Sequence, residues 1–106
     1  MKFLTFLFLI SAILTADGAA LAANPAPHYK GYQLAPLTRV TLSEARRLAL
    51  LARDGVVTNE ELQKESGGSG LRYSFDIKSG DKTFEVDVDA QTGTILENKA
   101  QGPHPD

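Results

Sequence analysis

The stretch from Leu71 to Asn98 alternates between apolar and polar side chains, and this alternation limits the possible folds more than any other feature. Apolar residues recur at every second position on both sides of the break Ser79-Gly80-Asp81, and a second break at residues 90–93 precedes a third short run. A period of two is typical of strands with one buried face, and short breaks favour antiparallel neighbours. The stretch therefore predicts an antiparallel meander whose apolar face is covered by another element.

The covering element is predicted to be a helix over Leu42–Arg53, where apolar residues recur at helical spacing. Thr41 and Glu44 have the spacing of a capping box, in which each side chain accepts a hydrogen bond from the other residue's backbone amide. Gly55 follows the run and is expected to end the helix in a left-handed conformation. Arg53 then lies in the last turn, where a cation suits the helix dipole.

The segment before the helix, residues 23–39, contains three prolines and no clean periodicity, which favours an extended linker. Its tyrosines and leucines leave open the alternative that it packs on the domain. Leu50 bears on the same question, because at about 100° per residue it falls on the opposite side of the helix from the apolar stripe. Leu50 is predicted to be an exposed leucine, or to be covered by residues 29–37 or by a partner.

Val56–Glu65 is predicted to be an edge strand with a charged outer face, and a helix over Asn59–Glu65 is the alternative. The fold class is then α+β, with one helix packed on a four-stranded antiparallel sheet. Replacing Phe84 by alanine is expected to cost roughly 3–5 kcal/mol of stability. The four predicted strands are Val56–Glu65, Leu71–Lys78, Lys82–Asp89 and Thr94–Asn98. The predicted core is Leu42, Ala45, Leu48, Ala49, Ala52, Val57, Leu62, Tyr73, Phe75, Ile77, Phe84, Val86, Val88 and Ile95.

Residues 1–22 have the pattern of a secretory signal peptide. Lys2 supplies the positive start, residues 3–14 form an apolar run, and Ala20-Leu21-Ala22 offers a small-residue cleavage site. The apolar run is shorter than the ~20 residues that a membrane-spanning helix needs. We therefore expect an exported domain at residues 40–99, periplasmic or secreted, without a membrane anchor after cleavage. Residues 100–106 show no pattern and are predicted to form a disordered tail.

The composition excludes several classes of function. The chain has no cysteine, which rules out a disulfide, a thiol nucleophile and a lipidated cysteine. Eleven basic residues stand against 13 acidic ones, and the net charge of −2 argues against a nucleic-acid binder. The only histidines, His28 and His104, lie in the predicted tails, where no rigid scaffold would hold a general base. We therefore predict no catalytic residues and no enzymatic activity.

One run of acidic residues has the beginning of a calcium-binding loop, Asp87-x-Asp89-x-Gln91. The pattern then fails, because Thr92 stands where the loop needs a glycine and Asn98 stands where it needs a bidentate glutamate. Strand alternation instead places Asp87 and Asp89 on a solvent-facing side. The sequence thus predicts no metal site and no cofactor. Residues 89–93 are expected to form a tight turn with Gly93 at positive φ.

Most of the predicted globular part, Val40–Lys99, resembles a PepSY domain. The most specific piece is the V-D-A-x-T-G-x-I/L turn, and Asp54 departs from the pattern, since many members have a proline there. The resemblance implies one helix on a small antiparallel sheet and an exported or cell-envelope setting. It also implies a relation to propeptides of secreted metallopeptidases and to small envelope proteins, without a catalytic motif. The residues that carry it are Thr41-Leu42-Ser43-Glu44-Ala45, Ala49-Leu50, Gly55-Val56-Val57, Tyr73-Ser74-Phe75-Asp76-Ile77, residues 84–90 and Thr92-Gly93-Thr94-Ile95-Leu96.

These observations together predict a monomeric, non-catalytic binding module that regulates or inhibits a peptidase of the bacterial envelope, so its partner is a protein. One alternative is a periplasmic sensor that holds a small ligand or a metal between helix and sheet, which requires a pocket. Another is an assembly component that pairs with itself through its edge strand. The candidate partner-binding residues are Leu50 and the charged side of the sheet, namely Arg72, Asp76, Lys78, Glu85, Asp87 and Asp89.

Overall fold

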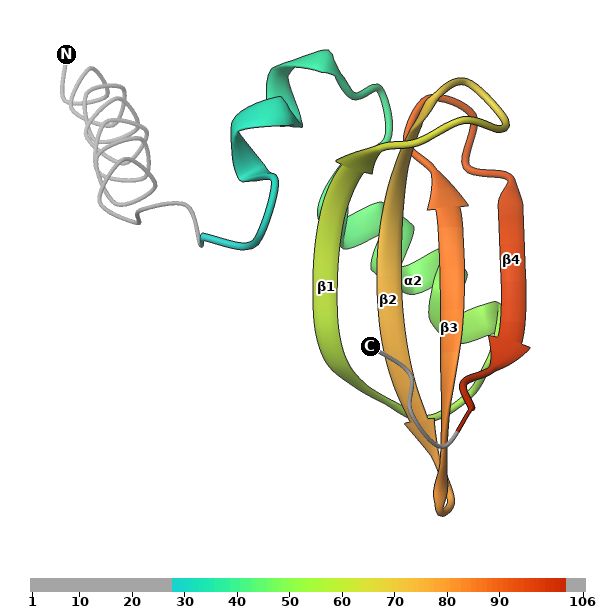
Figure 1. The fold of residues 1–106 in the computed structure, drawn as a ribbon. Helices are drawn as coiled ribbons and strands as arrows, with labels where there is room; N and C mark the ends of the chain where they lie inside the picture. Colours follow the sequence, from blue (N-terminus) through green and yellow to red (C-terminus); the bar gives the residue numbers. More distant parts are fainter. Residues whose placement is uncertain (1–27, 103–106) are drawn as a thin grey trace, which may run out of the picture.

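The computed structural model describes residues 28–102, which form a single sheet with a helix across one face (Figure 1). The predicted signal peptide lies outside these residues, as do residues 23–27 and 103–106. Among the described residues, no helix is both long enough and apolar enough to cross a membrane. The elements in chain order are the 3-10 helix η2 (Tyr32–Leu37), the helix α2 (Leu42–Ala52), and the strands β1 (Val56–Lys64), β2 (Leu71–Ser79), β3 (Lys82–Asp89) and β4 (Ile95–Ala100).

The four strands lie side by side in the order of the sequence, and every neighbouring pair is antiparallel. This confirms the predicted α+β fold, and it decides the open case at residues 59–65 in favour of strand. The face that α2 covers, here called the inner face, carries the apolar half of the alternation (Figure 1). Its fully buried residues are Ala45, Ala49, Leu62, Leu71, Tyr73, Phe75, Ile77, Val86, Val88 and Ala90.

Six of the 14 residues predicted to be in the core are not fully buried. Four of them are half-buried and pack against the core, namely Leu42, Leu48, Ala52 and Val57, and the other two are Ile95 and Phe84. Ile95 is 37% exposed. It begins the edge strand β4 next to a bulge, where Ile95 pairs with Val88, Glu97 pairs with Asp87, and Leu96 between them has no partner in β3. Phe84 is half-buried, and the Arg53 guanidinium covers its ring at 3.8 Å from the centroid. Conversely, Leu71 and Ala90 are buried although they were not predicted to be in the core.

The start of α2 follows the prediction only in part. The backbone amide of Glu44 donates to the Thr41 hydroxyl at 3.1 Å, so Thr41 is the N-cap. The reciprocal half of the capping box was wrong. The Glu44 carboxylate instead accepts from the Arg47 guanidinium at 2.6 Å, one turn further along the helix.

The end of α2 differs from the prediction. Arg53 lies beyond the last turn as the C-cap in an extended conformation, and Gly55 has a φ of 156°, so no left-handed cap forms. The side-chain amide of Asn98, which belongs to β4, caps the end of the helix instead. It donates to the Ala52 carbonyl at 3.2 Å and accepts from Arg53 Nε at 3.2 Å. A side chain 46 residues away thus satisfies a free carbonyl at the helix end.

The described part of the predicted linker packs on the domain instead of extending away from it. The Lys30 carbonyl accepts from the Leu62 amide of β1 at 2.8 Å, and Lys30 pairs with Glu61 as a parallel bridge. Gly31 follows with φ 87°, and a Cβ there would lie 1.7 Å from the Leu62 carbonyl oxygen, so only glycine allows this approach. Tyr29, Leu34 and Ala35 then pack against the core.

Leu50 is half-buried and packs against the core, as Tyr29 and Leu34 of the preceding segment also do, so the interpretation of Leu50 as an exposed leucine was wrong. The apolar stripe of α2 is broad enough to include it. The leucine that α2 exposes is Leu51, with 73% of its surface accessible.

The C-terminal end of the sheet runs further than expected. β4 continues to Ala100, and the Gln101 amide donates to the Thr83 carbonyl at 2.9 Å. The first residues of the predicted disordered tail therefore continue the strand. At the other end of β4, the turn from Asp89 to Gly93 is confirmed, with Gly93 at φ 80°.

Candidate functional site

The face of the sheet opposite α2, here called the outer face, gathers the charged half of the alternation. The strand register sets Arg72 beside Asp89, Asp76 beside Glu85, and Asp87 beside Glu97. Side chains that face each other across antiparallel strands stand about 5 Å apart, which is close enough for charges to interact. Acidic residues from β3 and β4 are thereby brought together with one arginine from β2.

Arg72 and Asp87 form a buried ion pair at the centre of this face. Their side chains are 8% and 1% exposed, and Nη1 donates to Oδ2 at 2.9 Å. Arg72 Nη2 also donates to the Ser66 carbonyl at 3.0 Å, which holds the loop between β1 and β2. Burial acts to lower the Arg72 pKa, but the hydrogen bond and charge of Asp87 outweigh it and raise the pKa. Two buried atoms of the pair, Arg72 Nε and Asp87 Oδ1, have no hydrogen-bond partner.

Asp89 joins two loops. Its carboxylate accepts from the Ser69 amide at 2.7 Å and the Ser69 hydroxyl at 2.8 Å, and from the amides of Gln91 and Thr92 at 2.8 and 3.1 Å. Burial acts to raise its pKa, but these hydrogen bonds outweigh it and lower the pKa to about 2. Asp89 therefore remains a carboxylate whose oxygens are fully engaged, and its role is structural.

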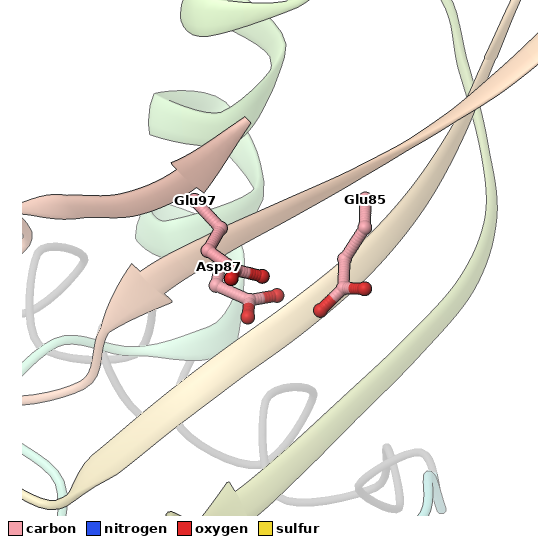
Figure 2. A group of neighbouring side chains, drawn as sticks. All are labelled: Glu85, Asp87 and Glu97. Atoms are coloured by element: carbon pink, nitrogen blue, oxygen red, sulfur yellow. The ribbon is translucent and has the colours of Figure 1, made fainter. Parts of the chain in front are cut away.

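The third group is a cluster of three carboxylates from β3 and β4, namely Glu85, Asp87 and Glu97 (Figure 2). One oxygen of each lies within 4.8 Å of one oxygen of the others. Partial burial, a side-chain hydrogen bond with Asp87 and the charges of Asp87 and Glu97 raise the Glu85 pKa to about 7, against the opposing effect of Lys99. The cluster is thus partly protonated near neutral pH, and its chemistry is that of a site for protons or cations.

The structure brings together some of the predicted partner-binding residues and separates others. Leu50 lies on α2, on the opposite side of the sheet from the charges. Lys78 is exposed near the end of β2, and Asp76 accepts from the Gln101 side chain at 2.7 Å. The interpretation of Asp87 and Asp89 as solvent-facing was wrong, since each is 1% exposed.

Sequence reasoning missed two residues of this face. Glu97 belongs to the carboxylate cluster, and Ser69 supplies two of the hydrogen bonds to Asp89. The signal for Glu97 was its place in a predicted strand next to β3, but only the register shows that it meets Asp87. No comparable signal pointed to Ser69, because it lies in a run of only serine and glycine at residues 66–70.

The two edges of the sheet differ. At one edge of the sheet, Lys30 pairs with the side of β1 that faces away from β2. The Lys30 carbonyl accepts from the Leu62 amide, and the Lys30 ammonium forms an ion pair with Glu61. Within residues 28–102, β4 pairs with β3 alone. Because Gln101 donates to β3, the alternation of an antiparallel ladder directs the amides of Ala100 and Asn98 towards the free side. The β4 edge thus offers unpaired main-chain groups to another chain.

Comparison with known families gives one result. The family described as "Peptidase propeptide and YPEB domain", or PepSY, matches residues 39–99, which is more than half of the chain. The match contains α2 and the sheet almost to the end of β4. Neither a curated protein nor a solved structure matches the chain.

Proposed function

This chain belongs to the PepSY family, and from that premise we propose that it is an exported, non-catalytic binding module that restrains or otherwise regulates a peptidase. PepSY domains are generally propeptide or regulatory modules, and they occur in exported proteins. The signal-peptide pattern of residues 1–22 supports export on independent grounds.

The observation that carries the proposal is the open edge of β4. An extended peptide segment of a partner gains main-chain hydrogen bonds by adding to such an edge, and alternate side chains give the pairing its specificity. The sequence of β4, Ile95–Ala100, has no proline, and its one lysine and one glutamate form an ion pair with each other at 3.5 Å, so their charges offset each other at this edge. The β1 edge is less suitable, because Lys30 already occupies part of it.

The charged outer face is a weaker docking surface than this edge. Arg72, Asp87 and Asp89 are buried and hydrogen-bonded within the domain, so a partner would have to break those contacts to reach them. Rim charges that remain accessible, such as Lys78, would affect the rate of encounter more than the affinity.

The proposal is tested by titrating the purified chain into assays of peptidases from the envelope of its source cells. We expect at least one peptidase to be inhibited, and Ala100→Pro to weaken the inhibition, because proline removes a donor on the free side of β4 while leaving the bonds to β3 intact. Ala100→Val is the matched control, since it enlarges the side chain and keeps the donor. Unchanged activity of every peptidase would refute regulation, and equal inhibition by the proline variant would refute docking at β4.

A further inference from the structure

The carboxylate cluster of the outer face has the geometry of a cation site. Its members come from two neighbouring strands with fixed register, Asp87 directly opposite Glu97 and Glu85 two residues before Asp87. No two of the three ligand oxygens are more than 4.8 Å apart. Two oxygens bound to the same calcium ion, at about 2.4 Å each, lie at most about 4.8 Å apart, whereas the limit for magnesium is about 4.2 Å. Three oxygens at this limiting separation would each lie about 2.8 Å from their common centre, so a small rotation of the side chains brings all three to the calcium distance without movement of the strands.

A second observation, independent of the number of acidic groups, indicates that a ligand is missing from the hydrogen-bond network. Asp87 is 1% exposed, and only its Oδ2 is engaged, by Arg72. Its Oδ1 is buried, accepts no hydrogen bond and belongs to the side chain at the centre of the cluster (Figure 2). A buried carboxylate oxygen to which no protein group donates is uncommon, because folding removes hydration that another ligand must replace.

The charges around this oxygen favour a cation as the missing ligand. The groups that face the cluster are Arg72 from β2 and Lys99 from β4. Arg72 neutralises one side of Asp87, and Lys99 lies 3.5 Å from Glu97 with most of its side chain in solvent. When all five groups are charged, the three carboxylates outnumber the two cations, so the cluster has a net negative charge. Glu97 is 37% exposed, which leaves a side open for the water ligands that calcium needs to complete six to eight contacts.

From these contacts we propose that Glu85, Asp87 and Glu97 form a calcium-binding site on the outer face of the sheet. This site is distinct from the failed loop pattern Asp87-x-Asp89-x-Gln91, since Asp89 is held by backbone amides and takes no part in it. Calcium here joins β3 to β4, and so fixes the strand that forms the open edge of the sheet. A proton shared between Glu85 and Asp87 is the competing occupant of the same position.

The test is a titration of the purified chain with calcium chloride, followed by calorimetry and by the melting temperature, against sodium chloride at the same ionic strength and against magnesium chloride. We expect a saturable rise of the melting temperature with calcium alone. Glu97→Gln is expected to raise the calcium Kd by about tenfold or more, because affinity follows the ligand charge. Glu61→Gln, the same change on the same face of β1, is the matched control and should leave the Kd unchanged.

Glu85→Gln is a second variant at the site, and it should also raise the calcium Kd by about tenfold or more, because it removes the charge of another proposed ligand. A melting temperature that responds to pH but not to calcium would assign the cluster to the shared proton and overturn the proposal. An undiminished calcium response in Glu97→Gln, or an equal response to magnesium, would overturn it as well.

Discussion

The two faces of this sheet exclude water by different means. On the inner face, Phe75, Val86 and their neighbours are fully buried under α2. Their contribution to stability depends mainly on how well the volumes of their side chains fill the interior. Within residues 28–102, no helix lies over the strands on the outer face (Figure 1). Asp87 and Asp89 are nevertheless as deeply buried as the inner core, because neighbouring charged side chains and the β1–β2 loop cover them. Each outer-face residue therefore depends on a particular partner, and the loss of that partner leaves a charge without solvent.

The largest expected effect lies on the inner face. Phe75→Ala should lower the free energy of unfolding by about 4 kcal/mol, because the ring is fully buried and leaves a cavity. Phe84→Ala should cost about half as much, since the Phe84 ring is only half-buried, with the Arg53 guanidinium over it. Urea denaturation of both variants provides the measurement. A larger loss of unfolding free energy for Phe84→Ala than for Phe75→Ala would show that the core residues of β3 contribute more to stability than those of β2.

The next effect tests whether outer-face burial depends on partners. Arg72→Met should lower the free energy of unfolding by about 3 kcal/mol, because it leaves Asp87 buried without its ion pair next to two other carboxylates. Adding Asp87→Leu should restore a large part of that loss, since an apolar pair of similar size needs no counter-charge. If the double variant is less stable than Arg72→Met in the same denaturation assay, then the packing of side-chain volume, and not the pairing of charges, determines the stability of this face as well.

The third prediction concerns acid. The folded pKa of Asp89 is about 2 against an ordinary value of 3.8, so its contribution to stability is complete above pH 3.8 and is lost as the pH falls towards 2. That contribution is about 2 kcal/mol, and Asp89→Asn should remove it at neutral pH. The unfolding free energy of the variant should also vary less with pH in this acid range. Asp81→Asn, in the exposed turn before β3, is the control that should leave the profile unchanged.

The smallest effect has the opposite sign. The folded pKa of Glu85 is raised from 4.5 to about 7, so ionisation opposes folding, and stability falls as the pH rises through this range. With a chelator present, Glu85→Gln should stabilise the protein by about 1 kcal/mol above pH 7, a modest value because solvent screens this half-exposed group. Below pH 4.5 the effect should vanish. A destabilised variant at high pH would contradict the assigned repulsion.

The same contrast explains which parts of the structure followed from sequence. Alternation predicted the strands and the inner face, because a period of two reports which side of the sheet a residue occupies. It does not report burial, and so Asp87 was assigned to solvent although Arg72 and the register bury it. The error at Ile95 has a related cause, since the bulge at Leu96 shifts the pattern by one residue.

Long-range contacts set the remaining limits. The end of α2 was assigned to Gly55 from local rules, whereas Asn98 caps it from the far edge of the sheet. The packing of residues 28–37 depends on the contact between Lys30 and Leu62, which no local pattern encodes. Within the candidate site, the residue types and faces were predictable, and the pairing of Glu97 with Asp87 was not.

Lys30 and Gly31, here called the strap, lie against the free edge of β1. This contact affects how two copies of the domain could associate. If two copies joined by their β4 strands, a two-fold axis would relate them, and each end of the joined sheet would be a β1 strand partly covered by its own strap. The strap would obstruct further strand pairing at each end, whereas a sheet with two open edges can template a fibre. Any side chain at Gly31 would collide with the Leu62 carbonyl and lift the strap. Gly31 thus permits the contact that partly covers the second edge of the sheet.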